Sequence, residues 1–236
     1  MMQLYQAAVA FALAAFSANS ESLRSVAFRS NSGIRNRNAR IMTAKPRIAI
    51  VIGPTRPGRC ADKAADWMLK QAKARDDIET ELLDLLDHPL PFFDEKGPVM
   101  SMPRENAEAS RWQKTLARHD GFVFVVAEYN HSITGVLKNA FDQAYNEWGR
   151  KPFTAIGYGG NGAARAVEHL RLITIALRMV STEASVHVGG ADFMSTSTMG
   201  ANKPIEDIEA SLLAATKSAL DELGWWVHAT KAAKAA

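Results

Sequence analysis

Five short segments of the chain have the residue pattern of β-strands that are buried in a parallel sheet. They are "RIAIVIG" (47–53), "IETELLDL" (78–85), "GFVFVVA" (121–127), "FTAIGYG" (153–159) and "EASVHVGG" (183–190). Between and after them, apolar residues recur at helical spacing. This spacing predicts helices over about 60–75, 104–118, 133–148, 166–177 and 208–223. The alternation predicts an α/β fold: a flavodoxin-like, doubly wound, five-stranded parallel sheet within a three-layer sandwich.

In folds of this type, ligands bind beyond the carboxyl ends of the strands, near the point where the strand order reverses. The loops after the first, third and fourth predicted strands are therefore the informative ones. Each of the three carries residues that packing alone does not require.

The first loop, "GPTRPGRCAD", has the G-x-x-x-x-G spacing of a phosphate loop, from Gly53 to Gly58. Arg59-Cys60 stands where a nucleotide-triphosphate site needs Lys-Ser/Thr, so that motif fails. A hydroxyl (Thr55), a guanidinium (Arg56) and the backbone N–H groups of a helix start still favour a monophosphate. The alternative for the loop is a simple turn with solvated arginines. Cys60 is interpreted either as a thiol with a lowered pKa at the helix start or, preferably, as a small buried residue.

The second loop begins with "EYNHS", five polar side chains directly after an apolar strand. Tyr129 can pack against a planar ligand, and Asn130 and backbone N–H groups can bind the edge of its ring. Glu128 alone is weak evidence for a general base, and His131 is interpreted as positional. The alternative is a solvated loop that caps the next helix. The histidines show no pair at metal-ligand spacing, so we predict no metal site.

The third loop, "GYGGNGAAR", matches the dinucleotide pattern G-x-G-x-x-G at Gly157, Gly159 and Gly162. Its place on the fourth strand, without a clear acidic residue after a second strand, weakens that interpretation. We prefer a tight glycine turn that lets backbone approach a flat ring; a plain strand-to-helix turn is the alternative.

Charge and cysteine content narrow the function classes. The net charge of +3 comes from residues 1–41, which hold five arginines and one acid; 42–236 hold 23 basic and 24 acidic residues. No basic face with interleaved aromatic residues indicates nucleic acid, and the single cysteine excludes an intramolecular disulfide framework.

The first forty residues differ in character from the rest. The apolar run at 7–16 is shorter than the ~20 residues that span a bilayer, so we predict no membrane span. The segment after it resembles an organellar transit peptide, but Met42 is a natural start for a compact domain. We predict a disordered leader at 1–41, either a targeting peptide or an upstream extension, and one domain at 42–236. The expected location is the cytoplasm, or an organelle if the leader is genuine.

Together the three loops resemble the NADPH-dependent FMN reductase family, which includes flavoproteins that act on quinones, azo dyes and chromate. The resemblance covers about 45–188. Its Gly-Ser-x-Arg, Pro-Glu-Tyr-Asn, Leu-Lys-Asn-Ala and Gly-Gly motifs correspond to 53–56, 127–130, 137–140 and 159–160. Pro54, Ala127 and Thr134 depart from the family pattern, and Pro54 also removes a backbone N–H.

The resemblance implies an FMN-dependent NAD(P)H oxidoreductase with a ping-pong cycle, in which NADPH or NADH reduces flavin N5 and a small-molecule acceptor follows. It implies no catalytic side chain. The implied cofactor contacts are Thr55, Arg56, Cys60 and Ala61 for the phosphate, Glu128, Tyr129, Asn130 and His131 around the ring, and Gly159 and Gly160 at its other edge.

The resemblance further implies a homodimer or tetramer, with Trp148 and "LPFF" (90–93) as contact candidates, although core packing is the preferred interpretation for any one of them. The alternatives are a flavin electron carrier, a redox-sensing flavoprotein that turns over negligibly, and an NAD-dependent dehydrogenase that uses the glycine turn.

Overall fold

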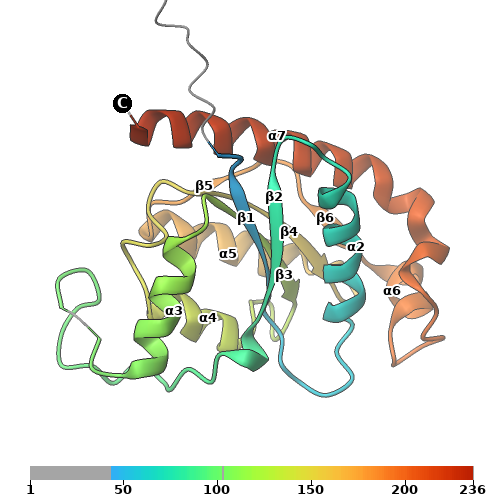
Figure 1. Ribbon diagram of the computed structural model, residues 1–236. Helices are drawn as coiled ribbons and strands as arrows, with labels where there is room; N and C mark the ends of the chain where they lie inside the picture. The colour runs from blue at the N-terminus through green and yellow to red at the C-terminus, as the bar shows by residue number, and fades with distance from the viewer. Residues whose placement is uncertain (1–43, 103, 236) are drawn as a thin grey trace, which may run out of the picture. The chain divides into compact units, whose positions relative to one another are not determined.

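The computed structural model describes residues 44–102 and 104–235, so the predicted leader lies outside the described residues. The described chain forms a parallel sheet with helices on both faces (Figure 1). The strand order β2-β1-β3-β4-β5 is flavodoxin-like, as predicted. The strands are β1 (Arg47–Ile52), β2 (Glu79–Asp84), β3 (Gly121–Ala127), β4 (Pro152–Tyr158), β5 (Val180–Ser181) and β6 (Val186–Val188).

The helices fall near their predicted places, with one helix and two short 3₁₀ segments in addition. They are α2 (Ala61–Lys73), α3 (Ala107–Ala117), α4 (Gly135–Asp142), α5 (Ala164–Ala176), α6 (Gly190–Thr196) and α7 (Glu209–Ala235), with η1 (Leu85–Asp87) and η2 (Ile205–Ile208). Two of the α-helices have side-chain caps: the Asn106 side chain accepts hydrogen bonds from two N–H groups of α3, and that of Thr134 accepts one from α4.

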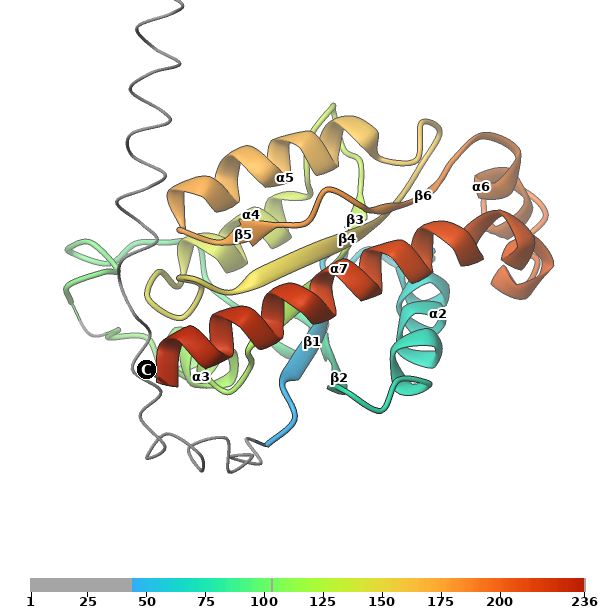
Figure 2. The ribbon, with the colours of Figure 1, turned by 90° about the horizontal axis from the view of Figure 1, so that it is seen from above.

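The two faces of the sheet bury separate hydrophobic clusters, because successive strand residues point to opposite faces. Ile48, Ile50 and Ile52 pack with α2 and α7. Ala49 and Val51 point the other way, into a cluster with residues of α3, α4 and α5. Figure 2 shows the sheet between α7 and α5. Both central strands, β3 and β4, are buried along their whole length, which explains their continuous apolar sequences.

The fifth strand differs from its prediction. It consists of two short strands, β5 and β6, that both pair with β4. In the gap between them, the carbonyl oxygen of Ala184 accepts a hydrogen bond from Thr154 Oγ1 (2.8 Å), and the N–H groups of Glu183 and Ala184 donate to Glu222 on α7. These side-chain hydrogen bonds replace the missing strand pairing. The periodicity of the sequence does not predict them.

Trp148 also differs from its prediction. α4 ends at Asp142, so Trp148 follows the helix rather than continuing its stripe. It is 1% exposed and contacts Phe122 and Phe141 with ring centroids 4.9 and 5.1 Å away. Trp148 is therefore a core residue of this chain. None of the helices in the described part of the chain is long and apolar enough to cross a bilayer.

Candidate functional site

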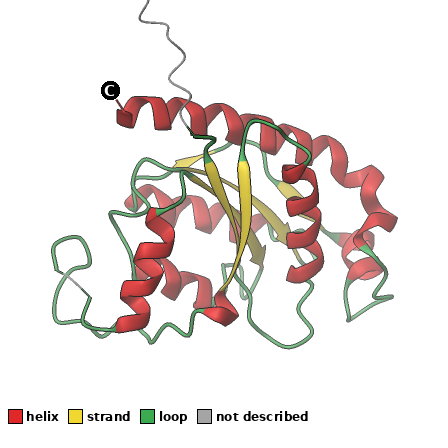
Figure 3. Cartoon of the chain, viewed as in Figure 1, coloured by secondary structure: helices red, strands yellow, loops and turns green. Residues whose placement is uncertain are grey.

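The loops after β1, β3 and β4 lie at one edge of the sheet, because all three strands run parallel and pair as neighbours. Figure 3 shows the arrowheads of the strands pointing to the lower edge, where these loops lie. The backbone N–H of Gly53 donates to the carbonyl of Val125, and the Thr134 hydroxyl to the carbonyl of Gly53 (3.4 Å). A Cβ placed on Gly159 would lie 3.9 Å from Glu128 Cβ.

The two arginines of the first loop have different environments. The Arg59 side chain is 6% exposed, and its guanidinium donates to the carbonyl of Pro54 (2.7 Å) and to the carboxylates of Asp62 and Asp84. Arg56 is exposed. Arg59 therefore shapes the loop from within, while the Arg56 side chain extends from it into solvent.

Charge pairing stabilises this arrangement. The hydrogen bond with Asp84 raises the pKa of Arg59 above its ordinary value, although burial opposes the rise. For Asp84, burial raises the pKa, but the bonds to Arg59 and to the N–H of Leu86 outweigh it, so the pKa lies below the ordinary carboxyl value. Both groups are charged near neutral pH.

α2 begins directly after this loop. Cys60 is its N-cap, is buried, and makes no capping hydrogen bond with its side chain. Ala61 is the first helical residue, and Thr55 is half-buried at the other end of the loop. The first N–H groups of a helix have no partner within the helix, and their partial positive charge favours an anion.

The second loop is a tight turn with both central residues in the left-handed region. Tyr129 and Ser132 exchange backbone hydrogen bonds of 2.8 and 3.0 Å, and Asn130 and His131 have φ of 50° and 68°. Asn tolerates this conformation best among non-glycine residues, and such conformations cluster at ligand sites. The turn leaves Tyr129 41% exposed at the edge of the sheet.

Arg165, on α5, holds this turn in place. Its guanidinium pairs with the Glu128 carboxylate and lies 2.9 Å from His131 Nε2. An arginine can only donate, so His131 Nε2 accepts and the ring proton resides on Nδ1. Burial raises the pKa of Glu128, but the hydrogen bond with Arg165 outweighs it, so the pKa lies below its ordinary value. Glu128 is thus an anchoring carboxylate, which argues against a general base.

Packing within the protein explains the glycines of the third loop at Gly157 and Gly162. A Cβ on Gly157 would lie 2.7 Å from the carbonyl oxygen of Gly162; one on Gly162, which has φ +61°, would lie 2.9 Å from His187 Cβ. Gly159 has φ +149°. The G-x-G-x-x-G pattern therefore follows from a turn that packs tightly on itself, without a dinucleotide.

Gly160 is the exception in that turn. Within the described part of the chain, a Cβ built on it would meet no atom within 4 Å, and its φ is not in the left-handed region. The protein itself does not require glycine there. An open face of backbone beside the Glu128 turn is what the approach of a flat ligand would require.

The sequence reasoning missed Tyr158, the last residue of β4. Its side chain is buried, its ring lies 6.4 Å from that of Phe193, and its hydroxyl has no hydrogen-bond partner among the described residues. Burial, and then the proximity of Cys60, raises its pKa above the ordinary value. Glu128 Oε2 is likewise buried without a partner there. Such atoms are costly unless a ligand or water meets them.

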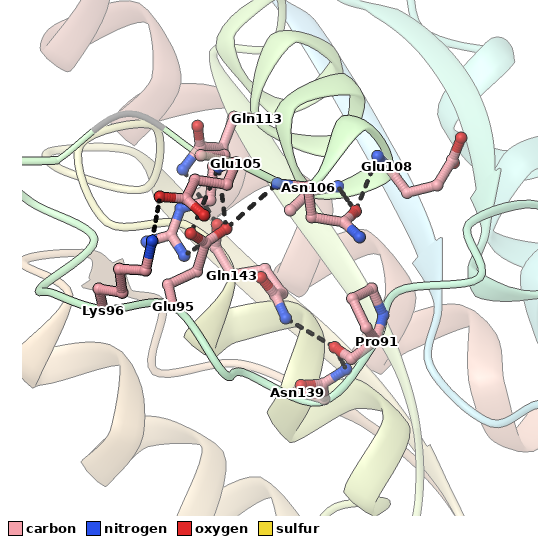
Figure 4. A network of polar contacts seen from close by, with 11 residues as sticks. Pro91, Glu95, Lys96, Glu105, Asn106, Glu108, Gln113, Asn139 and Gln143 are labelled. Carbon is pink, nitrogen blue, oxygen red and sulfur yellow. Dashed lines mark hydrogen bonds and ion pairs between the residues drawn. The ribbon is translucent and has the colours of Figure 1, made fainter.

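The segment between β2 and α3 is held against α4. Asn139 and Gln143 donate to the carbonyl of Pro91 at 2.9 and 2.7 Å, and Glu95 accepts from the backbone N–H of Asn106 (Figure 4). Asn139 is the asparagine of the Leu-Lys-Asn-Ala motif, so that motif residue has a structural role here. The same segment leaves Phe92 84% exposed.

The part of the chain that the structure describes contains no group of three or more His, Cys, Asp or Glu residues placed to hold a metal ion.

Comparison with known proteins shows which family the chain is similar to. The model of the NADPH-dependent FMN reductase family matches residues 46–192. An NAD(P)H-dependent FMN reductase of Schizosaccharomyces pombe is 33% identical over 142 residues, 59% of this chain and 71% of the relative. A 2-hydroxy-1,4-benzoquinone reductase of Burkholderia sp. is 31% identical over 141 residues, 57% of this chain and 73% of the relative.

The flavoenzyme NAD(P)H:(acceptor) oxidoreductase FerB of Paracoccus denitrificans has the same fold. Its TM-score is 0.58 at 21% identity, covering 78% of this chain and 98% of that structure. Because the family model matches well over half of the residues, the chain belongs to the NADPH-dependent FMN reductase family.

Proposed function

We propose that the protein is an FMN-dependent NAD(P)H oxidoreductase that passes electrons to quinone, azo, chromate or flavin acceptors in a ping-pong cycle. The observation that carries the proposal is the juxtaposition at one edge of the sheet. The helix start of α2 offers donors for a phosphate. The other two loops offer an open glycine backbone beside buried oxygens of Tyr158 and Glu128 that have no hydrogen-bond partner among the described residues.

Each loop would hold one part of the cofactor. Thr55, Arg56 and the N–H groups of Cys60 and Ala61 would bind the phosphate. Tyr129, Asn130 and His131 would border the ring, with Glu128 anchoring their turn. Gly159 and Gly160 would contact the other edge of the ring through backbone.

Bound FMN supplies a hydride acceptor at N5 and returns electrons to an oxidised substrate. The residues of the chain bind and orient it. Glu128 stays ionised in its pair with Arg165, so it moves no proton. The backbone N–H groups of Gly160 and Asn161 would stabilise negative charge on a ring beside them, because those of Gly159 and Gly162 already donate to the carbonyls of Val188 and Gly159. One open edge would serve both substrates in turn, as a ping-pong order requires.

The test is an absorption spectrum of the purified protein, then steady-state oxidation of NADPH and NADH with a quinone and no added reductase. We expect a flavin spectrum and parallel double-reciprocal lines. A colourless protein that takes up NAD but not FMN would contradict the proposal. Flavin binding without turnover would indicate an electron carrier or a redox sensor instead.

Arg56→Ala tests the phosphate assignment. We expect about a tenfold weaker FMN affinity, the size of one charge-assisted hydrogen bond, and unchanged affinity for riboflavin, which lacks the phosphate. Fluorescence titration with both flavins measures this. Arg111→Ala is the control, because Arg111 pairs with Glu108 on the surface of α3. An equal loss for both flavins would refute the role of Arg56.

We also propose that two or four copies associate through the exposed Phe92. Phe92→Ser is expected to lower the oligomer mass in sedimentation without changing the melting temperature.

For the location, we propose the cytoplasm, or an organelle if residues 1–41 direct the chain there; mass spectrometry of the native N-terminus distinguishes the two.

A further inference from the structure

A segment of the chain beyond the family match contacts the loop after β1. The family model ends at residue 192, and residues 197–203, here named the strap, follow α6. The Thr198 hydroxyl donates to the carbonyl of Gly58 at 2.8 Å. Gly58 has φ +69° and forms the tight bend of the loop, where a Cβ would lie 3.7 Å from Thr198 Oγ1.

Lys63 fastens the strap to the first turn of α2. Its ammonium group donates to the carbonyls of Thr196 (2.8 Å), Asn202 (3.1 Å) and Lys203 (2.8 Å), and to Asn202 Oδ1 (2.8 Å). A cation in the first turn of a helix is disfavoured by the helix dipole. Four oxygen acceptors offset that cost, so the position of Lys63 is explained by its hold on the strap.

The strap is also rigid within itself. The N–H groups of Gly200 and Asn202 both donate to the carbonyl of Ser197, and that of Met199 donates to the Ser197 hydroxyl. A Cβ on Gly200 would lie 1.9 Å from the carbonyl oxygen of Met194. Thr198 is therefore presented to the loop by a fixed support rather than by a loose end.

The contact fixes the direction of a backbone donor. In a planar trans peptide, the carbonyl and the following N–H point in opposite directions. The bond from Thr198 to the carbonyl of Gly58 thus turns the Arg59 N–H away from the strap. The Arg59 guanidinium donates to the carbonyl of Pro54, so the Thr55 N–H points away from that guanidinium for the same reason. Contacts within the protein therefore orient both N–H groups without a ligand.

We propose that Thr198, held by Lys63, is a positioning residue that sets the affinity for the phosphate of the flavin and so the preference for FMN over riboflavin. This inference rests on the proposed function. It assigns to the C-terminal part of this chain a role in the phosphate site that the family-matched region does not contain.

The test compares Thr198→Val with Thr196→Val. Both remove one hydroxyl, but that of Thr196 donates to the carbonyl of Asp192 within α6 rather than to the loop. We expect Thr198→Val to weaken FMN binding about 3- to 10-fold, the equivalent of one hydrogen bond, and to leave riboflavin affinity unchanged. Lys63→Met should act in the same direction, and Thr196→Val should change neither affinity.

Amide hydrogen exchange of residues 54–60 in the flavin-free protein provides a second readout. We expect faster exchange in Thr198→Val than in Thr196→Val. Equal weakening of both flavins, or unchanged affinity together with unchanged exchange, would overturn the inference. If the wild-type chain binds neither flavin, the proposed function fails, and the exchange comparison alone then decides whether the strap orders the loop.

Discussion

Arg59→Met is expected to lower the free energy of unfolding by about 3 kcal/mol, the lower end of the range for breaking a buried ion pair. The lower end applies because the Asp84 side chain remains 22% exposed. The substitution keeps most of the aliphatic stem but leaves the Asp84 carboxylate and the carbonyl of Pro54 without their main donor. Urea denaturation at neutral pH measures the loss.

The pH dependence of this loss has a definite sign. In the wild type, the pKa of Asp84 lies below its ordinary value, so its contribution is present above about pH 4 and is lost as pH falls through the lower folded pKa. In Arg59→Met the lowering by the guanidinium is gone and burial raises the pKa of Asp84. Asp84 then protonates readily, so the stability difference between the two proteins should narrow in acid.

Two variants control for side effects. Arg111→Met breaks an exposed pair and should cost less than about 1 kcal/mol. Adding Asp84→Asn to Arg59→Met should recover part of the lost stability, because no charge is then buried alone. A loss in Arg59→Met that is the same from neutral pH to pH 4 would show that the ion pair is not its cause.

Gly162→Ala and Gly160→Ala are expected to differ sharply although the two glycines belong to one turn. Gly162→Ala should cost at least about 2 kcal/mol, because it adds a left-handed φ for alanine to a contact of 2.9 Å with His187 Cβ. Gly160→Ala should stay within about 0.5 kcal/mol of the wild type, as an exposed substitution without steric conflict does.

For flavin affinity, in contrast to stability, Gly160→Ala is expected to have a large effect. Gly160→Ala fills the open face of the turn, so FMN and riboflavin affinities should both fall while the melting temperature stays constant. Gly135→Ala is the matched control: its Cβ also meets no atom within 4 Å, but it lies on the first turn of α4. If Gly160→Ala bound both flavins as tightly as the wild type, the ring would not lie against this turn.

The strand order and the two-sided packing were predictable, because the period of apolar residues depends on burial and is visible locally. β3 is apolar along its length since both of its faces are covered. The placement of three unusual loops at one edge followed from parallel pairing alone. The family motifs then pointed to the residue types of the site.

Several features of the site could not be predicted, because they depend on contacts between distant residues. Nothing in "TRPGR" distinguishes Arg56 from Arg59; the partner that does so, Asp84, is 25 residues away from Arg59. In the sequence Tyr158 is an ordinary strand residue, and only the structure shows that its buried hydroxyl has no hydrogen-bond partner among residues 44–102 and 104–235. For Trp148, the preferred prediction of core packing is confirmed, but its place after the end of α4 could not be predicted from the spacing.

The long helix α7 begins at Glu209, outside the family match, yet Leu212, Leu220, Leu223 and Val227 on it form part of the core on one face of the sheet. The segment that matches the family model is therefore shorter than the segment that forms the hydrophobic core. A recombinant fragment that ends at residue 192 would expose the apolar face of the sheet that α7 covers, so we expect it to aggregate. Expression of this chain should therefore retain its last helix.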